Sequence, residues 1–173
     1  FPSAKSVVLL MWEKAKDFLT RAFTVIFMAT VIIWFMQTFD TRLNVVENSA
    51  DSILAALGRL VSPIFAPLGF GDWRMVTALV SGFTAKEAVV STFGVILGVS
   101  TEQLGIALHS LFTTASAASF LAFCLLYTPC VAAVSTIKTE LKSGWKTVGI
   151  VFAQCLVAWL AAFMVYHVGL LLT

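Results

Sequence analysis

Long runs of apolar residues set the main constraint on how this chain folds. The last run, residues 145–172, is long enough to cross the hydrocarbon core of a bilayer, which takes about 20 residues at roughly 1.5 Å per residue. Hydrophobic residues make up 60% of the 173 positions and charged residues only 12%, well below the roughly 25% of soluble domains. The mean hydropathy is +0.96. This composition predicts an all-α, polytopic bundle of transmembrane helices with broken or re-entrant segments.

Several functional classes are excluded by what the sequence lacks. A net charge of +2, without a basic and aromatic patch, argues against nucleic acid as a partner. The cysteines, Cys124, Cys130 and Cys155, lie in apolar segments without CxxC spacing, so we expect neither a disulfide framework nor a structural zinc. Phosphate-binding loops and hydrolase motifs are absent from the sequence, so we predict no enzyme and no bound cofactor. The chain begins at Phe1, which suggests a segment of a longer protein.

The apolar runs and their breaks divide the chain into predicted helices. Basic and aromatic residues make 1–21 a membrane-surface lead-in on the cytoplasmic side, followed by a transmembrane region over 22–173. Spanning helices are predicted over 22–39, 73–99, 103–128 and 145–172. Shorter helices, re-entrant or interfacial, are predicted over about 52–61 and 130–141. The acidic stretch 40–51 is predicted to be a loop facing away from the cytoplasm.

Counting these spans conflicts with the distribution of basic residues. The two basic groups are Lys14, Lys16 and Arg21 before the first span, and Lys138, Lys142 and Lys146 before the last. If the first group is cytoplasmic, three crossings put the second group outside, whereas the positive-inside rule prefers both inside. One resolution is that 103–142 is a broken, partly re-entrant element. The side of the C-terminus stays open.

Two adjacent charges, Lys86 and Glu87, lie inside the helix predicted over 73–99. Charges at membrane depth are costly and usually functional. On a regular helix of about 100° per residue, Glu87 borders a stripe of small and hydroxyl-bearing residues, and Lys86 points nearly the opposite way. The stripe consists of Thr77, Ser81, Thr84, Ala88 and Ser91.

This geometry leaves two interpretations of the charged pair. In the first, Glu87 lines a polar substrate path with Thr84 and Ser91, and Lys86 takes a partner elsewhere or the helix unwinds locally. In the second, Lys86 or Glu87 forms a buried ion pair with a neighbouring helix and holds the bundle together.

A second break, Thr128-Pro129-Cys130, has the pattern of a helix start, with Thr128 at the N-cap and Pro129 at the first helical position. A thiol at a helix N-terminus is more readily a thiolate. Thiolate, carboxylate and loose carbonyl donors together suit a transition metal such as ferrous iron. We therefore predict Cys130 and Glu87 as metal-contacting residues, with Lys86, Thr84, Ser91, Thr128 and Pro129 lining or gating the path. The alternative is a plain proline kink.

The remaining candidates are weaker. His109 and His167 have no ligand-spaced partner, so packing or a helix-end position explains them better than metal binding. We expect Cys124 and Cys155 to pack as small hydrophobic residues. The small residues of 113–119 allow close helix approach.

Several motifs, taken in order, resemble one known family. They are Phe65-Ala66-Pro67-Leu68-Gly69-Phe70-Gly71-Asp72-Trp73-Arg74, Gly82-Phe83 with Ala85-Lys86-Glu87 and Val89-Val90-Ser91-Thr92, and Leu126-Tyr127 with Pro129-Cys130-Val131-Ala132 and Ile137-Lys138. Trp12-Glu13 through Ala22 resembles the lead-in to them. The chain is similar to the FeoB-type ferrous iron transporters of bacteria, over the C-terminal part of their membrane domain, the second gate repeat.

The resemblance implies a multi-pass protein of the bacterial cytoplasmic (inner) membrane, with Fe(II) as transported substrate and the lipid bilayer as its surroundings. It implies as partners an N-terminal GTPase domain and a first gate repeat, both outside this chain, and a possible homo-oligomer. The family's gate cysteine maps onto Cys130 and its charged gate motif onto Lys86-Glu87. Phe23 departs from the glycine expected after Ala22. Half a gate pair is not expected to transport alone.

Two other functions stay open at this point. One is a structural membrane module that assembles or docks a partner through the small residues of 113–119. The other is a gate-type transporter for another cargo such as nucleosides.

Overall fold

The computed structural model describes residues 3–127 and 130–172, which form eight α-helices. The helices are α1 (Ala4–Thr38), α2 (Ile53–Phe65), α3 (Trp73–Gly82), α4 (Ala88–Leu97), α5 (Thr101–Leu111), α6 (Thr114–Leu126), α7 (Val131–Leu141) and α8 (Gly144–Leu172). Short 3-10 turns cover Ser49–Asp51 and Ala66–Leu68. The predicted all-α bundle with broken helices is confirmed.

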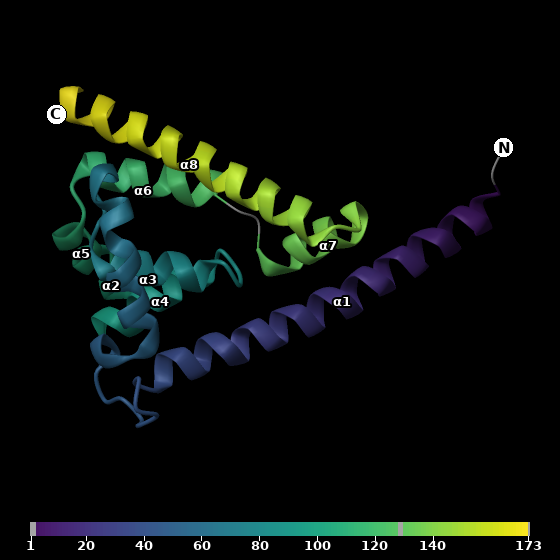
Figure 1. The fold of residues 1–173 in the computed structure, drawn as a ribbon, viewed down its shortest axis with the longest axis horizontal. Helices are drawn as coiled ribbons and strands as arrows, with labels where there is room; N and C mark the ends of the chain where they lie inside the picture. Colours follow the sequence, from purple (N-terminus) through teal and green to yellow (C-terminus); the bar gives the residue numbers. More distant parts are fainter. Residues whose placement is uncertain (1–2, 128–129, 173) are drawn as a thin grey trace.

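The helices form two long sides and one compact end (Figure 1). Helix α1 runs along one side, and α6 and α8 lie against each other along the other. The short helices α2 to α5 gather at the end that carries the C-terminus of α8. Helix α7 lies toward the opposite end, where it contacts both α1 and α8. The α3–α4 turn projects from this compact end into the space between the two long sides (Figure 1).

Aromatic side chains make the core that joins the compact end to α6. Phe70, between α2 and α3, is 1% exposed and contacts Phe120 of α6 edge to face, with ring centroids 5.3 Å apart. Phe65 stacks on Phe70 at 5.5 Å, and Phe93 of α4 contacts Phe120 at 5.8 Å. Such pairs stabilise a core beyond the area they bury. They link α4 and the α2–α3 connection to α6 through side chains.

Small residues bring α6 and α8 into close contact. Ser119, Ala158 and Ala162 are completely buried, and the Ser119 hydroxyl donates a hydrogen bond to the Ala162 carbonyl at 2.9 Å. Small side chains let helix backbones approach in lipid, where polar groups then bond across the interface. The small-residue segment 113–119 is thus used for packing within the chain on its Ser119 side.

The structure differs from the helix predicted over 73–99. Helix α3 ends at Gly82, residues 83–87 form a turn, and α4 begins at Ala88 and packs against α3. Thr84 helps to end α3, because both its N–H, at 3.1 Å, and its hydroxyl, at 2.7 Å, donate to the Ser81 carbonyl. The hydroxyl stripe is therefore divided between two helices, and the interpretation based on one regular helix is wrong.

Other helix bounds differ as well. The region predicted as a span over 103–128 contains α5 and α6, separated at Phe112 and Thr113. Thr113 and Ser116 form a reciprocal capping box that starts α6, with hydrogen bonds of 2.8 Å and 3.2 Å. Residues 4–21 of the predicted lead-in and residues 22–38 of the predicted span form one continuous helix, α1. Helix α2 continues through Pro63 to Phe65, beyond the expected 52–61.

Two stretches among the described residues are long and apolar enough to cross a membrane, Thr114–Leu141 and Gly144–Leu171. Up to four crossings result if each bent helix pair counts as one span. These pairs are α2 with α3, bent by 103°, and α4 with α5, bent by 80°. The apolar part of α1, Phe23–Thr38, is shorter than 18 residues. Which helices cross therefore stays a prediction.

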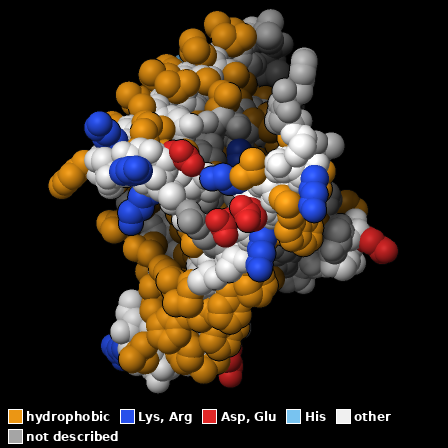
Figure 2. All heavy atoms as spheres, turned by 90° about the vertical axis from the view of Figure 1, so that its right-hand side faces the viewer, with side chains coloured by type: hydrophobic (Ala, Val, Ile, Leu, Met, Phe, Trp, Pro, Cys, Tyr) orange, Lys and Arg blue, Asp and Glu red, His pale blue; other side chains and the backbone are white. Residues whose placement is uncertain are grey.

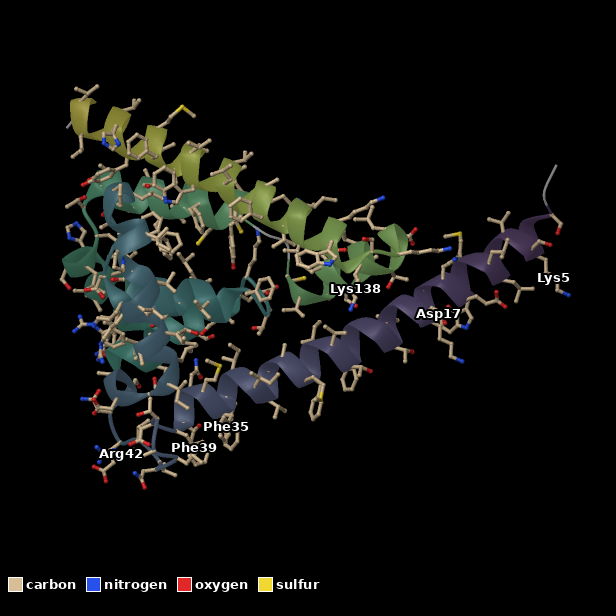
Figure 3. All side chains as sticks on the ribbon, viewed as in Figure 1. Lys5, Asp17, Phe35, Phe39, Arg42 and Lys138 are labelled. Atoms are coloured by element: carbon tan, nitrogen blue, oxygen red, sulfur yellow. The ribbon has the colours of Figure 1, made fainter. Side chains whose placement is uncertain are left out.

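The two groups of basic residues lie toward the same end of the molecule. Lys138 projects from α7 on the side facing α1, and Asp17 lies along the N-terminal half of α1 (Figure 3). Lys14, Lys142 and Lys146 are all exposed. Viewed from this end, charged side chains gather across the middle of the surface, with hydrophobic ones above and below (Figure 2). This arrangement allows both groups to lie on one side of a membrane, as the positive-inside rule requires.

Packing between α6 and α8 gives a test of the fold. Ser119→Leu places a large side chain where the helices touch, and we expect it to destabilise the protein by about 1–3 kcal/mol. Ala118→Leu, one position along the same helix and exposed, is the matched control and should change little. Thermal unfolding in detergent measures both variants. Equal melting temperatures for the two variants would contradict this packing.

Candidate functional site

The two helix breaks meet in the middle of the molecule. The first is the α3–α4 turn at 83–87, and the second follows the end of α6 at Leu126 and precedes α7 at Val131. The Val131 N–H, at the start of α7, donates to the Phe83 carbonyl at 3.0 Å. We call the contact between residues 82–87 and the described residues of 124–131 the junction. This hydrogen bond joins the backbones of two segments that are more than 40 residues apart in the sequence.

Lys86 makes the most direct contact across the junction. Its ammonium donates hydrogen bonds to the Cys124 carbonyl at 2.9 Å and the Leu125 carbonyl at 3.1 Å. The last carbonyls of a helix have no partner within the helix and carry its partial negative charge, so a cation there is stabilising. The hydrogen-bond partners of Lys86 are thus two backbone carbonyls. The helical wheel did not predict these partners, and they are not the buried ion pair of the second interpretation.

Tyr127 closes the junction from the side of α6. The Lys86 ammonium lies 5.2 Å from the centre of its ring, within the range of a cation–π contact. The Tyr127 ring stacks on Phe123 at 5.5 Å, and its hydroxyl lies 3.4 Å from the Leu79 carbonyl of α3. Gly82 is required here, because a Cβ at that position would lie 2.9 Å from the Tyr127 hydroxyl and would also clash with Val89.

Cys130 and Glu87, the predicted metal contacts, each lie at a helix N-terminus. Cys130 is half-buried and is the N-cap of α7, so α7 starts later than the sequence pattern predicts. Glu87 is exposed and is the N-cap residue of α4, where a negative charge is favourable. Among residues 3–127 and 130–172, no three His, Cys, Asp or Glu side chains converge as metal ligands. Metal contact by these two residues stays a prediction.

The other predicted path residues have local roles or lie outside the description. Thr84 is buried and its hydroxyl caps α3, as described above. Ser91 is exposed, and its hydroxyl donates to the Ala88 carbonyl within α4 at 3.1 Å. Thr128 and Pro129 fall outside the described residues.

A cavity of about 750 Å³ opens beside the junction, between α4, α5 and α6. Its walls are mainly apolar, including Val89, Phe93 and Leu121. Lys86 lies on its wall, as does His109, which belongs to the last turn of α5. A histidine there can interact with the helix end, in line with the helix-end position inferred for His109.

Sequence reasoning missed the role of Tyr127 and of the carbonyls at the end of α6. A signal for them existed, because a proline at 129 has no N–H to offer the carbonyl of Leu125, four residues earlier. A free carbonyl at membrane depth needs a donor. In the structure, the Lys86 ammonium donates a hydrogen bond to that Leu125 carbonyl.

Gly82 provides a test of the junction. Gly82→Ala forces Tyr127 and Val89 apart, so we expect lower thermal stability and several-fold faster alkylation of Cys130, read out by site-specific mass spectrometry. Gly105→Ala is the control, since a Cβ at Gly105 meets nothing within 4 Å. It should leave alkylation unchanged and raise stability by up to about 1 kcal/mol. Unchanged Cys130 reactivity in Gly82→Ala would contradict a tightly closed junction.

Relatives of this chain are found among iron transporters. It is 32% identical over 178 residues to the Fe(2+) transporter FeoB of Methanocaldococcus jannaschii, covering 99% of this chain and 26% of that protein. It is 38% identical over 170 residues to the Fe(2+) transporter FeoB of Staphylococcus aureus strain COL, covering 97% and 25%. The Fe(2+) transport protein A/FeoB fusion protein of Porphyromonas gingivalis is 28% identical over 219 residues, covering 98% and 26%.

The chain spans about a quarter of the length of these curated relatives. No solved structure matches it significantly. A family model described as "Gate: Nucleoside recognition" matches residues 19–144, which include both helix breaks and α2 to α7. The resemblance stated from the sequence motifs is confirmed, and the chain is a membrane protein segment that belongs to the Gate family.

Proposed function

We propose that this chain is part of the permease domain of a bacterial Fe(II) uptake transporter and lines a metal path across the cytoplasmic membrane. The observation that supports it most is similarity to proteins named Fe(2+) transporters over 97–99% of the chain. The junction adds a physical reason. Transport sites are commonly built where discontinuous membrane helices expose their ends near the bilayer midplane.

Cys130 and Glu87 are the residues we assign to the metal path. Each lies at the start of a helix that follows a break, and both breaks meet at the junction. A thiolate and a carboxylate together suit a borderline divalent metal such as Fe(II). Two side chains hold such an ion only transiently, which is what conduction requires.

The remaining parts of a transporter lie outside this chain. The relatives are about four times longer, so they contain further segments beside the matched one. We propose that a first gate repeat, an N-terminal GTPase domain and further copies of the same protein complete the path and drive it. This chain itself is then a conducting element and not an enzyme, in agreement with its match to a gate region.

The position of the basic residues supports a topology in the inner membrane. With Lys14 and Lys142 at the cytoplasmic face, α1 runs outward, the loop at 40–48 is external, and α6 with α7 returns inward. The α3–α4 pair enters the membrane and turns back without crossing it. Helix α8 then ends outside.

Cysteine labelling of right-side-out vesicles tests this topology. We expect Asn44→Cys to react with an impermeant maleimide, and Lys14→Cys and Lys142→Cys to be protected until the vesicles are opened. External labelling at Lys142→Cys would show that α6 and α7 do not return to the cytoplasm.

A nucleoside cargo is the second candidate, because the description of the matched family names nucleoside recognition. The similarity to named Fe(2+) transporters favours the metal. A structural docking module is less supported, since Ser119 of segment 113–119 packs against α8.

Uptake by the full-length transporter tests the metal path. We expect Cys130→Ser to lower Fe(II) uptake at least tenfold and Glu87→Ala several-fold, because each removes an anionic ligand. Cys155→Ser, a matched thiol substitution in α8, should retain uptake. Uptake of ⁵⁵Fe(II) and of a labelled nucleoside into anaerobic vesicles measures all three variants. Fe(II) uptake at the wild-type rate by both Cys130→Ser and Glu87→Ala would show that these residues do not form the metal path. Uptake of the nucleoside but not of Fe(II) by the wild-type protein would show that the cargo is a nucleoside.

A further inference from the structure

The C-terminal end of α6 presents groups that attract a cation, namely two backbone carbonyl oxygens and the face of an aromatic ring. The carbonyls of Cys124 and Leu125 point at one position, where the Lys86 ammonium lies 2.9 Å and 3.1 Å from them. The face of the Tyr127 ring lies 5.2 Å away from the same position. Helix C-termini and unwound carbonyls are the groups that coordinate cations in broken-helix transporters. Here a cation already occupies the position, and it is part of the protein.

We propose that the Cys124 and Leu125 carbonyls, with the Tyr127 ring, form a cation site that takes a hydrated divalent metal ion when the Lys86 ammonium withdraws. Lys86 is then a tethered cation that keeps the site closed at rest. The inference rests on the proposed ion-conducting function and adds to it a second metal position and its control, separate from Cys130.

The ammonium has room to leave. Lys86 lies on the α3–α4 turn and is an exposed residue, so its movement does not require α4 to unwind. Its side chain is a flexible four-carbon stem. The cavity of about 750 Å³ lies directly beside it, because Lys86 is part of the cavity wall. The same cavity provides space for the waters that complete the shell of a metal bound to two carbonyls.

The ammonium and a metal ion cannot share the site. Two positive charges at contact distance repel each other. If Lys86 closes a cation site, removal of its charge should therefore create metal affinity. If Lys86 only caps the end of α6, the same substitution should lower stability without creating metal affinity. Carbonyl oxygens prefer hard divalent ions such as Mn(II), which is also detectable by its spectrum, so Mn(II) is the suitable probe.

The test is Mn(II) titration of nucleotide-free, full-length transporter in detergent, with free Mn(II) measured by electron paramagnetic resonance. Lys86→Met removes the charge and the hydrogen bonds. Lys86→Gln removes the charge but keeps an N–H donor for the carbonyls, and Lys86→Arg keeps both. Lys142→Met removes a lysine charge at the exposed end of α7 and is the matched control.

We expect Lys86→Met and Lys86→Gln each to bind Mn(II) at least tenfold more tightly at one site per chain, and Lys86→Arg and Lys142→Met to match wild type. Equal binding in all five proteins, or weaker binding in folded Lys86→Gln, overturns the proposal. If Lys86→Met does not elute as a folded protein, Lys86→Gln decides. Wild-type vesicles that take up no Fe(II) would instead refute the proposed function, and the Mn(II) titration would still decide the cation site.

Discussion

The hydrogen bonds from Lys86 to the end of α6 are the contact on which the centre of the structure depends. Inside a bilayer, a helix that stops must have its last carbonyls satisfied by protein, because lipid offers no donors. Lys86 supplies that donor to Cys124 and Leu125. The Val131 N–H, an unpaired donor at the start of α7, finds its acceptor at Phe83 on the same turn. Each break thus satisfies the open backbone groups of the other.

This mutual dependence explains the residue types at the junction. Gly82 must lack a side chain for the Tyr127 ring to reach across α3, and Thr84 must end α3 with its hydroxyl. A charge is tolerated at 86 since its ammonium is bonded to carbonyls and lies over an aromatic ring. The same features make the junction unstable toward change. Its polar contacts lie beside a cavity, whereas the α6–α8 contact is formed by fully buried small residues.

The sequence was sufficient for the class of fold and for the break marked by Pro129, whereas at Lys86 and Glu87 it predicted a continuous helix and left local unwinding only as an alternative. Apolar runs show where helices form, and a lysine, a glutamate and a proline mark where they are disturbed. A helical wheel, however, presumes a continuous helix through Lys86 and Glu87. The turn at 83–87 is set by tertiary contacts with Tyr127 and Val131, which lie more than 40 residues away and leave no trace in local periodicity. The partners of Lys86 are backbone carbonyls, and the one sequence signal for them is Pro129, which has no N–H to offer the Leu125 carbonyl.

The turn also accounts for the conflict over the basic residues. A helix that crosses over 73–99 places Lys138 and Lys142 on the opposite side from Lys14. A helix pair that turns back at Glu87 changes the number of crossings by one and returns them to the same side, where Figure 3 shows Lys138 facing α1. In the proposed topology, the position of Lys86 and the number of crossings are linked, because the same turn at 83–87 places Lys86 at the end of α6 and reverses the chain between α3 and α4. A substitution that straightened this turn would take Lys86 away from the end of α6 and, in the proposed topology, would change the orientation of every later helix.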